Sequence, residues 1–265
     1  MSSLATGFTV TLHGAAGRMG RELFDAIQEQ PDITVVSMWE GSQHPRLGED
    51  IYHSGVSLTR PFESSAGDVV VDFSLPEGLG RLVDNWPDAG SALLSGTTGL
   101  SPHEQAALNR LAERIPVFYA ANMSLGIQLL KILTATATRM VGANWDVELL
   151  ERHHSRKADA PSGTALELAN TVRANCTRPL STVFGREGRS ALRNRDEMGI
   201  FALRGGGIVG EHELLFAGPA ETVRISHQVQ SRKVFADGAL HAARWLCRQK
   251  PGRYGMDELF AETQP

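Results

Sequence analysis

The sequence predicts an α/β protein whose first domain is a doubly wound, Rossmann-type unit and whose second domain is an α+β unit with a mixed sheet. Two observations support this prediction. In the first half, strand-like segments without polar alternation recur between helical segments, which is typical of a parallel sheet covered by helices. In the second half, three strand-like segments lie close together along the chain, which favours antiparallel or mixed pairing.

The apolar patterns give the expected position of each element. In the first half, we expect strands over residues 8–13, 33–39, 68–74, 91–95 and 116–120, and helices over 19–29 and 102–114. In the second half, we expect helices over 123–141, 161–175 and 234–248, strands over 145–151, 199–204, 208–217 and 222–229, and an arginine-rich loop over 186–195. The expected domains are residues 1–124, to which 234–265 return, and residues 125–233.

The composition is that of an ordinary globular protein. The chain has 265 residues, of which 42% are hydrophobic and 21% charged, and its net charge of -4 disfavours nucleic acid as a partner. Cys176 and Cys247 form no CxxC pair, so we expect neither a disulfide framework nor a zinc knuckle. The sequence shows no basic start followed by an apolar run and no stretch that could span a bilayer. We therefore expect a cytoplasmic protein without a signal peptide or a membrane partner.

A glycine-rich turn follows the first expected strand. Gly14, Gly17 and Gly20 stand where glycine permits a tight turn and a close approach of a pyrophosphate to the backbone. The helix that follows supplies free N–H groups and the positive end of its dipole. Ala16 occupies a position where the usual dinucleotide fingerprint has glycine, so the turn alone also fits a strand–helix connection that binds no ligand.

The end of the second expected strand strengthens the nucleotide interpretation. Glu40 follows this strand, where an acidic residue can accept hydrogen bonds from ribose hydroxyls. Gly41 stands where an arginine could hold a 2′-phosphate, which favours NADH, while Arg18 keeps NADPH open. A solvated carboxylate is the alternative for Glu40. The order of strand, glycine turn, helix, strand and acid nevertheless favours dinucleotide binding.

Two later turns are expected at the same edge of the sheet. Gly96-Thr-Thr-Gly99 follows one strand, and Ala120-Ala-Asn-Met123 follows the next. Ligands of doubly wound folds bind outside the carboxyl ends of the strands. Both turns are therefore expected to reach the cofactor, although each one taken alone is more often structural.

A basic segment follows the strand expected over residues 145–151. Arg152, His153, His154, Arg156 and Lys157 create a local positive field in an acidic chain, which suits an anionic ligand. A histidine that titrates near neutral pH and a neighbouring lysine are also candidates for proton transfer.

The residues after the basic segment are typical of the start of a helix. We expect Asp159 to cap it and Pro161 to lie in its first turn. Thr164 and Glu167 are expected to form a capping box. The donors that could then bind a carboxylate are those of Ser162, Gly163 and Thr164.

The basic segment also has three other interpretations. A solvated loop is the commonest outcome for such a run of charges. A metal site is disfavoured because His153 and His154 are adjacent, so they point differently on a strand, and no third ligand stands at helical spacing. A nucleic-acid patch is disfavoured because the segment lacks interleaved aromatic residues. We expect no bound metal.

Together these motifs resemble the 4-hydroxy-tetrahydrodipicolinate reductase (dihydrodipicolinate reductase) family of the bacterial lysine and diaminopimelate pathway. The resemblance covers nearly the whole chain. Its most specific part is Glu151-x-His-His-x-x-Lys-x-Asp-Ala-Pro-Ser-Gly-Thr-Ala165. The supporting motifs are Gly14-x-x-Gly-Arg-Met-Gly20, Asp72-Phe-Ser-x-Pro-Glu-Gly78, Gly96-Thr-Thr-Gly99, Ala121-Asn-x-Ser124 and Val209-Gly-Glu-His212.

The resemblance implies a reaction, a set of roles and an assembly. The reaction is hydride transfer from NADH or NADPH to C4 of an unsaturated heterocyclic dicarboxylate, with loss of the 4-hydroxyl group. His153 would donate and accept a proton, and Lys157 would be a second proton donor that also holds the substrate. The residues implied to hold the substrate carboxylates are His154, Ser162, Gly163 and Thr164. Those implied to line the cofactor are Gly14, Ala15, Ala16, Gly17, Arg18, Met19, Glu40, Gly96, Thr97, Thr98, Ala120, Ala121, Asn122 and Met123. The family is typically a homotetramer assembled through the sheets of the substrate domain.

Three positions depart from the family pattern, and three other functions stay open. Met123 stands where many relatives carry an aromatic residue, Leu75 lies in a loop that is basic in some relatives, and Gly41 makes the choice between NADH and NADPH uncertain.

The other functions that stay open are a reductase of a different carbonyl or imine acid, a dinucleotide sensor without catalysis, and a metal-dependent hydrolase. The presence of both His153 and Lys157 argues against the sensor.

Overall fold

The computed structural model describes residues 7–87, 90–189 and 191–261. It divides into two compact units. One runs up to Ser124 and includes the chain from Arg232 onward, and the other runs from Leu125 to Ser231. Residues 1–6, on which the signal-peptide expectation rests, lie outside the described residues. Among the described helices, none has the length and hydrophobicity needed to cross a membrane.

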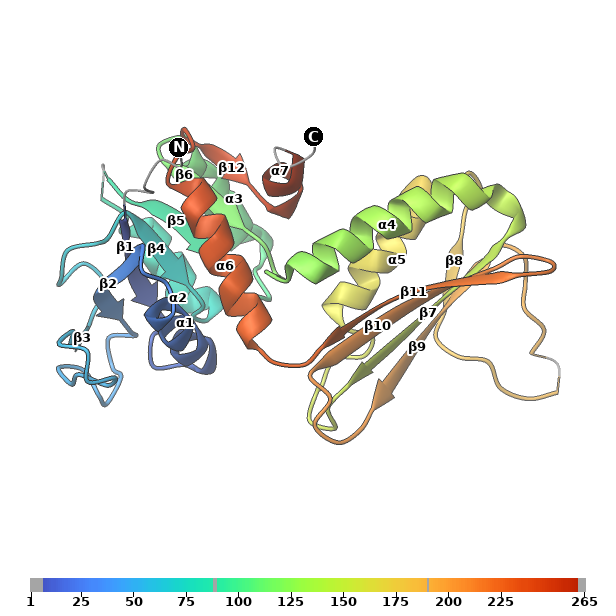
Figure 1. Ribbon diagram of the computed structural model, residues 1–265, viewed down its shortest axis with the longest axis horizontal. Helices are drawn as coiled ribbons and strands as arrows, with labels where there is room; N and C mark the ends of the chain where they lie inside the picture. The colour runs from blue at the N-terminus through green and yellow to red at the C-terminus, as the bar shows by residue number, and fades with distance from the viewer. Residues whose placement is uncertain (1–6, 88–89, 190, 262–265) are drawn as a thin grey trace. The chain divides into compact units, whose positions relative to one another are not determined.

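The first unit is built on a seven-stranded parallel sheet with the order β12-β6-β5-β4-β1-β2-β3 (Figure 1). Its strands are β1 (Phe8–His13), β2 (Ile33–Trp39), β3 (Leu58–Thr59), β4 (Val69–Asp72), β5 (Ala92–Ser95), β6 (Pro116–Tyr119) and β12 (Gly252–Tyr254). Its helices are α1 (Arg18–Gln28), α2 (Pro76–Asp84), α3 (Pro102–Ala112), α6 (Lys233–Leu246) and α7 (Met256–Ala261). The expected Rossmann-type sheet is confirmed.

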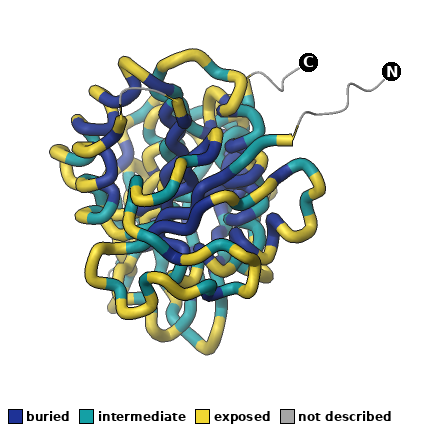
Figure 2. Tube along the Cα trace, turned by 90° about the vertical axis from the view of Figure 1, so that its left-hand side faces the viewer, coloured by how far each residue is buried: buried dark blue, intermediate teal, exposed yellow. Residues whose placement is uncertain are grey.

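Continuous apolar strands form the centre of this sheet. β4 and β5 are buried along their whole length, because helices cover both faces of the sheet (Figure 2). On one side, α2 and α3 pack over the sheet through Leu79, Leu108 and Val117. The remaining long helices, α1 and α6, pack against each other. This layering leaves the carboxyl ends of the strands and their turns to form a site.

Some short elements were not predicted from the sequence. These are β3, α2, β8, β12 and α7. The omission of α2 has a physical reason, because Gly78 and Gly80 interrupt its apolar pattern and glycine has low helix propensity. Pro76 at the first helical position is the signal that could have located this helix.

The second unit is built on a mixed five-stranded sheet with the order β11-β10-β7-β9-β8. Its strands are β7 (Asp146–His153), β8 (Ser181–Val183), β9 (Glu197–Arg204), β10 (Gly210–Ala217) and β11 (Thr222–Val229). Its helices are α4 (Leu125–Val141), a 3₁₀ turn (Gly142–Asn144) and α5 (Gly163–Asn175). β10 pairs antiparallel with β7 and β11, whereas β9 pairs parallel with β7 and β8, so the expected mixed sheet is confirmed.

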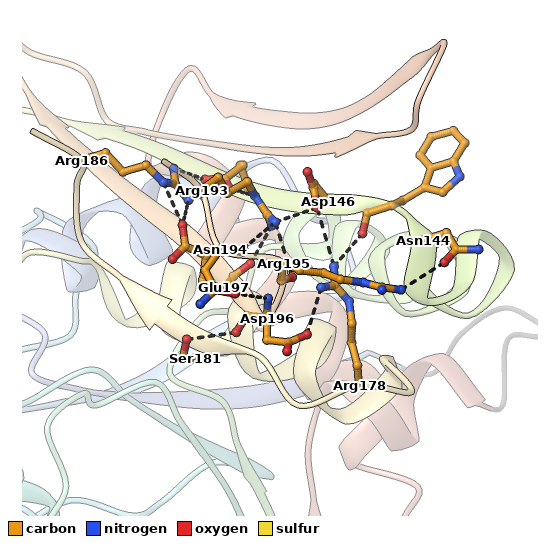
Figure 3. A network of polar contacts seen from close by, with 12 residues as sticks. Asn144, Asp146, Arg178, Ser181, Arg186, Arg193, Asn194, Arg195, Asp196 and Glu197 are labelled. Atoms are coloured by element: carbon orange, nitrogen blue, oxygen red, sulfur yellow. Dashed lines mark hydrogen bonds and ion pairs between the residues drawn. The ribbon is translucent and has the colours of Figure 1, made fainter. Parts of the chain in front are cut away.

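The side chains of β7 alternate between the two faces of this sheet. Val147 and Leu149 join a core with α4 and α5. Asp146 and Glu148 point to the opposite face, where they meet the arginine-rich loop that the sequence predicts. Arg193 donates to Asp146 at 2.6 Å and to Glu148 at 2.8 Å (Figure 3). Ion pairs therefore hold this loop to the sheet.

Candidate active site

The glycine turn after β1 requires glycine at two positions. Gly14 has a φ of +77°, and a Cβ atom there would lie 2.8 Å from the carbonyl oxygen of Phe73. A Cβ atom at Gly20 would overlap the carbonyl oxygen of Ala15, which is fully buried. The turn is therefore held close to the neighbouring β4 turn and to the first turn of α1, which begins at Arg18.

A cavity of about 320 Å³ lies at this turn, within the first unit. It is lined by His13, Gly14, Gly17, Glu40, Gly41, Phe73, Ser74, Leu75, Glu77, Gly78 and Arg81. Glu40 accepts a hydrogen bond from the backbone N–H of Ala16 at 3.1 Å, so its carboxylate reaches back to the glycine turn. Because the glycines leave backbone room for a pyrophosphate and an acid stands beside it, these residues fit a dinucleotide.

The turns after β5 and β6 each contain both exposed and buried residues. Thr98 is exposed after β5, whereas the hydroxyl of Thr97 is buried and donates to Asp72 at 2.8 Å. Beyond β6, Ala121 is exposed. Met123 is 1% exposed and lies against Gly238 of α6, so its side chain belongs to the core of the unit.

The basic segment of the second unit contains a buried hydrogen bond between Glu151 and His153. Both residues lie on the helix-covered face of β7, and the Nδ1 atom of His153 is 2.6 Å from Oε2 of Glu151. Gly210 on the neighbouring β10 makes room for the ring, because a Cβ atom there would lie 3.1 Å from Nε2 of His153. Nε2 is thus the ring nitrogen that Glu151 leaves unoccupied.

Glu151 accepts further hydrogen bonds, although none of its side chain is exposed. The two terminal nitrogens of Arg204 each donate to it at 2.8 Å, and the backbone N–H of Ser162 donates at 3.0 Å. Burial raises the pKa of Glu151, but the hydrogen bonds from Arg204 and His153 outweigh burial, and the pKa is lowered. An ionised carboxylate only accepts hydrogen bonds, so Nδ1 of His153 carries the proton.

The start of α5 differs from the sequence-based expectation. The cap is Ser162, whose hydroxyl accepts from the backbone N–H of Ala165, and the helix begins at Gly163. Asp159 does not cap the helix, because it lies outside this turn and pairs with Lys157 at 2.8 Å. The expected place of Pro161 in the first turn was also wrong, since it precedes the cap and follows a cis peptide bond.

The expected capping box is also corrected. Glu167 pairs with Lys131 of α4 at 2.7 Å, and the cap of α5 is the Ser162 hydroxyl alone. The carboxylate is drawn to a lysine on the neighbouring helix, which sequence spacing could not reveal.

His212 on β10 joins Glu151, His153 and Ser162 in one buried cluster. Its Nε2 atom lies 3.1 Å from the hydroxyl of Ser162, and its ring meets the ring of His153 edge to face at 5.3 Å. Burial lowers the pKa of His212 to about 4, and the neighbouring charges of His153 and Lys157 act in the same direction. His212 is therefore neutral at pH 7. Lys157 lies beside the cluster and is partly exposed.

Comparisons with known proteins show the family of the chain. The family model described as dihydrodipicolinate reductase, N-terminus, matches residues 8–123, and that described as dihydrodipicolinate reductase, C-terminus, matches residues 126–260. The chain belongs to the dihydrodipicolinate reductase family. The resemblance inferred from the motifs is confirmed, as is the expectation of an NAD(P)H-dependent oxidoreductase.

Individual relatives match this chain over nearly their whole length. A 4-hydroxy-tetrahydrodipicolinate reductase of Halorhodospira halophila is 40% identical over 257 residues, covering 93% of this chain and 96% of that protein. One of Alkalilimnicola ehrlichii is 39% identical over 261 residues, covering 95% and 98%. A solved dihydrodipicolinate reductase of Paenisporosarcina sp. TG-14, at 21% identity and a TM-score of 0.77, covers 95% of this chain and 99% of that one and shares the fold.

The structure brings together several residues that sequence reasoning did not assign a role. Arg204 and His212 join the basic segment from β9 and β10, and Asp72 and His13 lie beside the glycine turn. The signal for Asp72 was present in the sequence, since an acid ends a strand that is otherwise wholly apolar. Within the described residues, no cluster of three histidine, cysteine or acidic residues could hold a metal ion.

Proposed function

We propose that this chain reduces 4-hydroxy-tetrahydrodipicolinate to tetrahydrodipicolinate with NADH or NADPH, as part of lysine and diaminopimelate biosynthesis. Relatives that carry this activity in their names are about 40% identical to it over nearly its full length. The observation that carries the proposal is the buried hydrogen bond of 2.6 Å between Glu151 and His153, next to the start of α5.

The cofactor supplies a hydride to the substrate when it is bound. Gly14 and Gly17 line the cavity and leave room for its pyrophosphate, and Gly17 caps α1, so the start of this helix is proposed to bind the pyrophosphate. Glu40 is placed to accept from ribose hydroxyls, which favours NADH, because a carboxylate repels a 2′-phosphate. Arg18 at the start of α1 keeps NADPH usable.

His153 is proposed as the residue that exchanges a proton with the substrate. Glu151 occupies Nδ1, so Nε2 is the atom that gives or takes the proton. Lys157 is proposed as the second proton donor, and its positive charge, now paired with Asp159, would hold the negatively charged substrate.

The start of α5 is proposed to bind the substrate carboxylates. Gly163 is exposed at the first position of the helix, where backbone N–H groups and the positive end of the helix dipole suit a carboxylate. Ser162 is 2% exposed and its N–H is donated to Glu151, so its proposed contribution is chiefly to fix this turn. His154 is proposed as a further contact. In support, the Paenisporosarcina reductase is described as bound to dipicolinate, a dicarboxylate.

The proposal is tested with an assay of NADH and NADPH oxidation coupled to the synthase that makes the unstable substrate. His153→Gln removes the proton donor, so turnover should fall by roughly 100-fold while NADH binding is kept. Lys157→Ala should lower turnover and also raise the KM for the substrate, because the charge that holds the carboxylates is lost. The matched controls are His103→Gln and Lys250→Ala, which change exposed residues and should leave both quantities unchanged.

The outcomes separate the alternatives. Near-normal turnover in both site variants would sink the assignment of roles. NADH binding by the wild-type protein without turnover of this substrate would favour a dinucleotide sensor or a reductase of another carbonyl or imine acid, and a substrate panel would separate these two.

We also propose a cytoplasmic homotetramer that assembles through the face of the second unit's sheet opposite α4 and α5. Apolar residues on this face support it, since Leu203 is 51% exposed and Phe201 and Leu215 are partly exposed. The thiols of Cys176 and Cys247 are both free, which suits a reducing compartment.

A further inference from the structure

A fully buried carboxylate lies at the centre of the first unit's strand ends. Asp72 ends β4 and none of it is exposed. Its Oδ1 atom lies 2.7 Å from Nδ1 of His13 and accepts from the hydroxyl of Ser74 at 2.6 Å. Its Oδ2 atom accepts from the hydroxyls of Ser95 and Thr97 at 2.7 and 2.8 Å.

These donors come from three different turns. His13 ends β1, Ser74 begins the connection from β4 to α2, and Ser95 and Thr97 lie where β5 passes into the Gly96 turn. β5, β4 and β1 are neighbours in the sheet, so Asp72 links the carboxyl ends of three adjacent strands. His13 and Ser74 also line the cavity at the glycine turn.

The ionisation of Asp72 fixes the orientation of His13. Burial raises the pKa of Asp72, but the hydrogen bonds from His13, Ser74 and Ser95 outweigh burial and lower it. The carboxylate is therefore an acceptor only, and Nδ1 of His13 carries the proton it donates. Because Nδ1 is occupied by Asp72, Nε2 is the ring nitrogen that remains to meet a ligand in the cavity.

A buried carboxylate is a weak source of stability. It loses its hydration, and its hydrogen bonds within the protein do little more than offset that loss. Perturbed, buried ionisable groups gather at functional sites. The position of this pair, at the ligand-binding edge of the sheet and not in its middle, indicates a role in ligand binding.

We propose that Asp72 and His13 are positioning residues of the dinucleotide site: Asp72 fixes the three turns that receive the cofactor, and His13 presents its Nε2 edge to the cofactor's phosphate–ribose portion. This inference rests on the cofactor binding of the proposed function. It is independent of the proton-transfer roles of His153 and Lys157.

The test is a titration of NADH against the whole protein without substrate, read by fluorescence or calorimetry, with the melting temperature recorded in parallel. Asp72→Asn removes the charge at nearly constant volume, and His13→Phe keeps the ring but removes both nitrogens. Each variant should raise the Kd for NADH about tenfold or more, as expected when hydrogen bonds to a charged group are lost.

The control is Asp68→Asn, at the other end of the same strand pair. Asp68 is exposed and accepts from the N–H and hydroxyl of Thr9 at 2.7 and 2.8 Å, so it joins β1 to β4 as Asp72 does, but at their amino ends. This variant should keep the Kd of the wild-type protein, because no ligand binds at that edge.

The Kd for NADH decides the proposal. If Asp72→Asn melts at a lower temperature but binds NADH within about twofold of wild type, the pair is structural only and the proposal is overturned. If Asp72→Asn does not fold, His13→Phe decides, and an unchanged Kd in that variant overturns the proposal too. Normal NADH binding without turnover in the wild-type protein would refute the proposed function and leave this inference intact.

Discussion

At the scale of single residues, each unit uses a buried carboxylate to orient a histidine. Asp72 holds Nδ1 of His13 at 2.7 Å, and Glu151 holds Nδ1 of His153 at 2.6 Å. In both pairs the pKa of the acid is lowered because hydrogen bonds outweigh burial. The acid stays ionised, so the tautomer of each histidine is set before any ligand arrives.

His212 should make the stability of the protein depend on pH. Its pKa is lowered from 6.5 to about 4 by burial and by the neighbouring His153, so between these values the unfolded chain binds a proton that the folded chain lacks. The stability that depends on neutral His212 is therefore fully present above pH 6.5. As the pH falls toward 4, the free energy of unfolding decreases by about 3 kcal/mol in total. His227, whose pKa is also lowered by burial, acts in the same direction.

Urea unfolding at pH 7 and pH 5 measures this dependence. The wild-type free energy of unfolding should fall by about 2 kcal/mol between the two, and that of His212→Gln should fall by clearly less. His103→Gln, on an exposed helix position, should behave as the wild type does. Equal losses in the wild type and His212→Gln would contradict the assigned protonation state.

Sequence reasoning could identify chemistry-bearing residues but not their partners. His153 and Lys157 stand out because charged residues gather within a few positions of each other. The distant partners of Asp72 and Glu151 cannot be found in this way, since His13 is 59 residues from Asp72 and Arg204 is 53 residues from Glu151. Only the pairing of β1 with β4 and of β7 with β9 brings them together.

At the scale of elements, the long apolar segments were predictable and the ends of helices were less so. The start of α5 was misplaced because Asp159, Ser162 and Thr164 are all good capping residues by type. Local contacts decided among them, since Asp159 pairs with Lys157, two residues before it, and the hydroxyl of Ser162 accepts from the N–H of Ala165.

Two glycines inside helices should respond oppositely to replacement by alanine. Gly20 of α1 lies against the carbonyl of Ala15, so Gly20→Ala must push the glycine turn apart and should cost about 2 kcal/mol or more. A Cβ atom placed at Gly80 of α2 would have only Cγ of Glu104 within 4 Å, at 3.8 Å. Gly80→Ala should therefore stabilise the protein by about 0.5–1 kcal/mol through its higher helix propensity.

Thermal melting and NADH titration of these two variants check the expectation. Gly20→Ala should lower both the melting temperature and the NADH affinity, because the turn that it deforms lies beside the cavity. Gly80→Ala should raise the melting temperature. A shift of the same sign in both variants would show that the close approach at Gly20 does not decide its effect.

At the scale of the whole molecule, the fold class followed from the sequence while the order of the strands did not. Unbroken apolar strands between helices specify a covered parallel sheet, and the closely spaced strands of the second half specify a mixed one. The order depends on which strands pair, and β7 lies between β10 and β9 through contacts made far apart in the chain.

Leu203→Glu should separate the subunits of the proposed tetramer. Leu203 is 51% exposed on β9 beside Arg152 of β7, so a glutamate there is compatible with the folded chain but not with a buried subunit contact. Light scattering after size exclusion should give about four times the chain mass of 28.7 kDa for the wild type and a smaller value for the variant. The control, Val36→Glu, changes a residue that is 39% exposed on β2 of the other unit and should keep the wild-type mass. An unchanged mass in Leu203→Glu would place the subunit contact elsewhere.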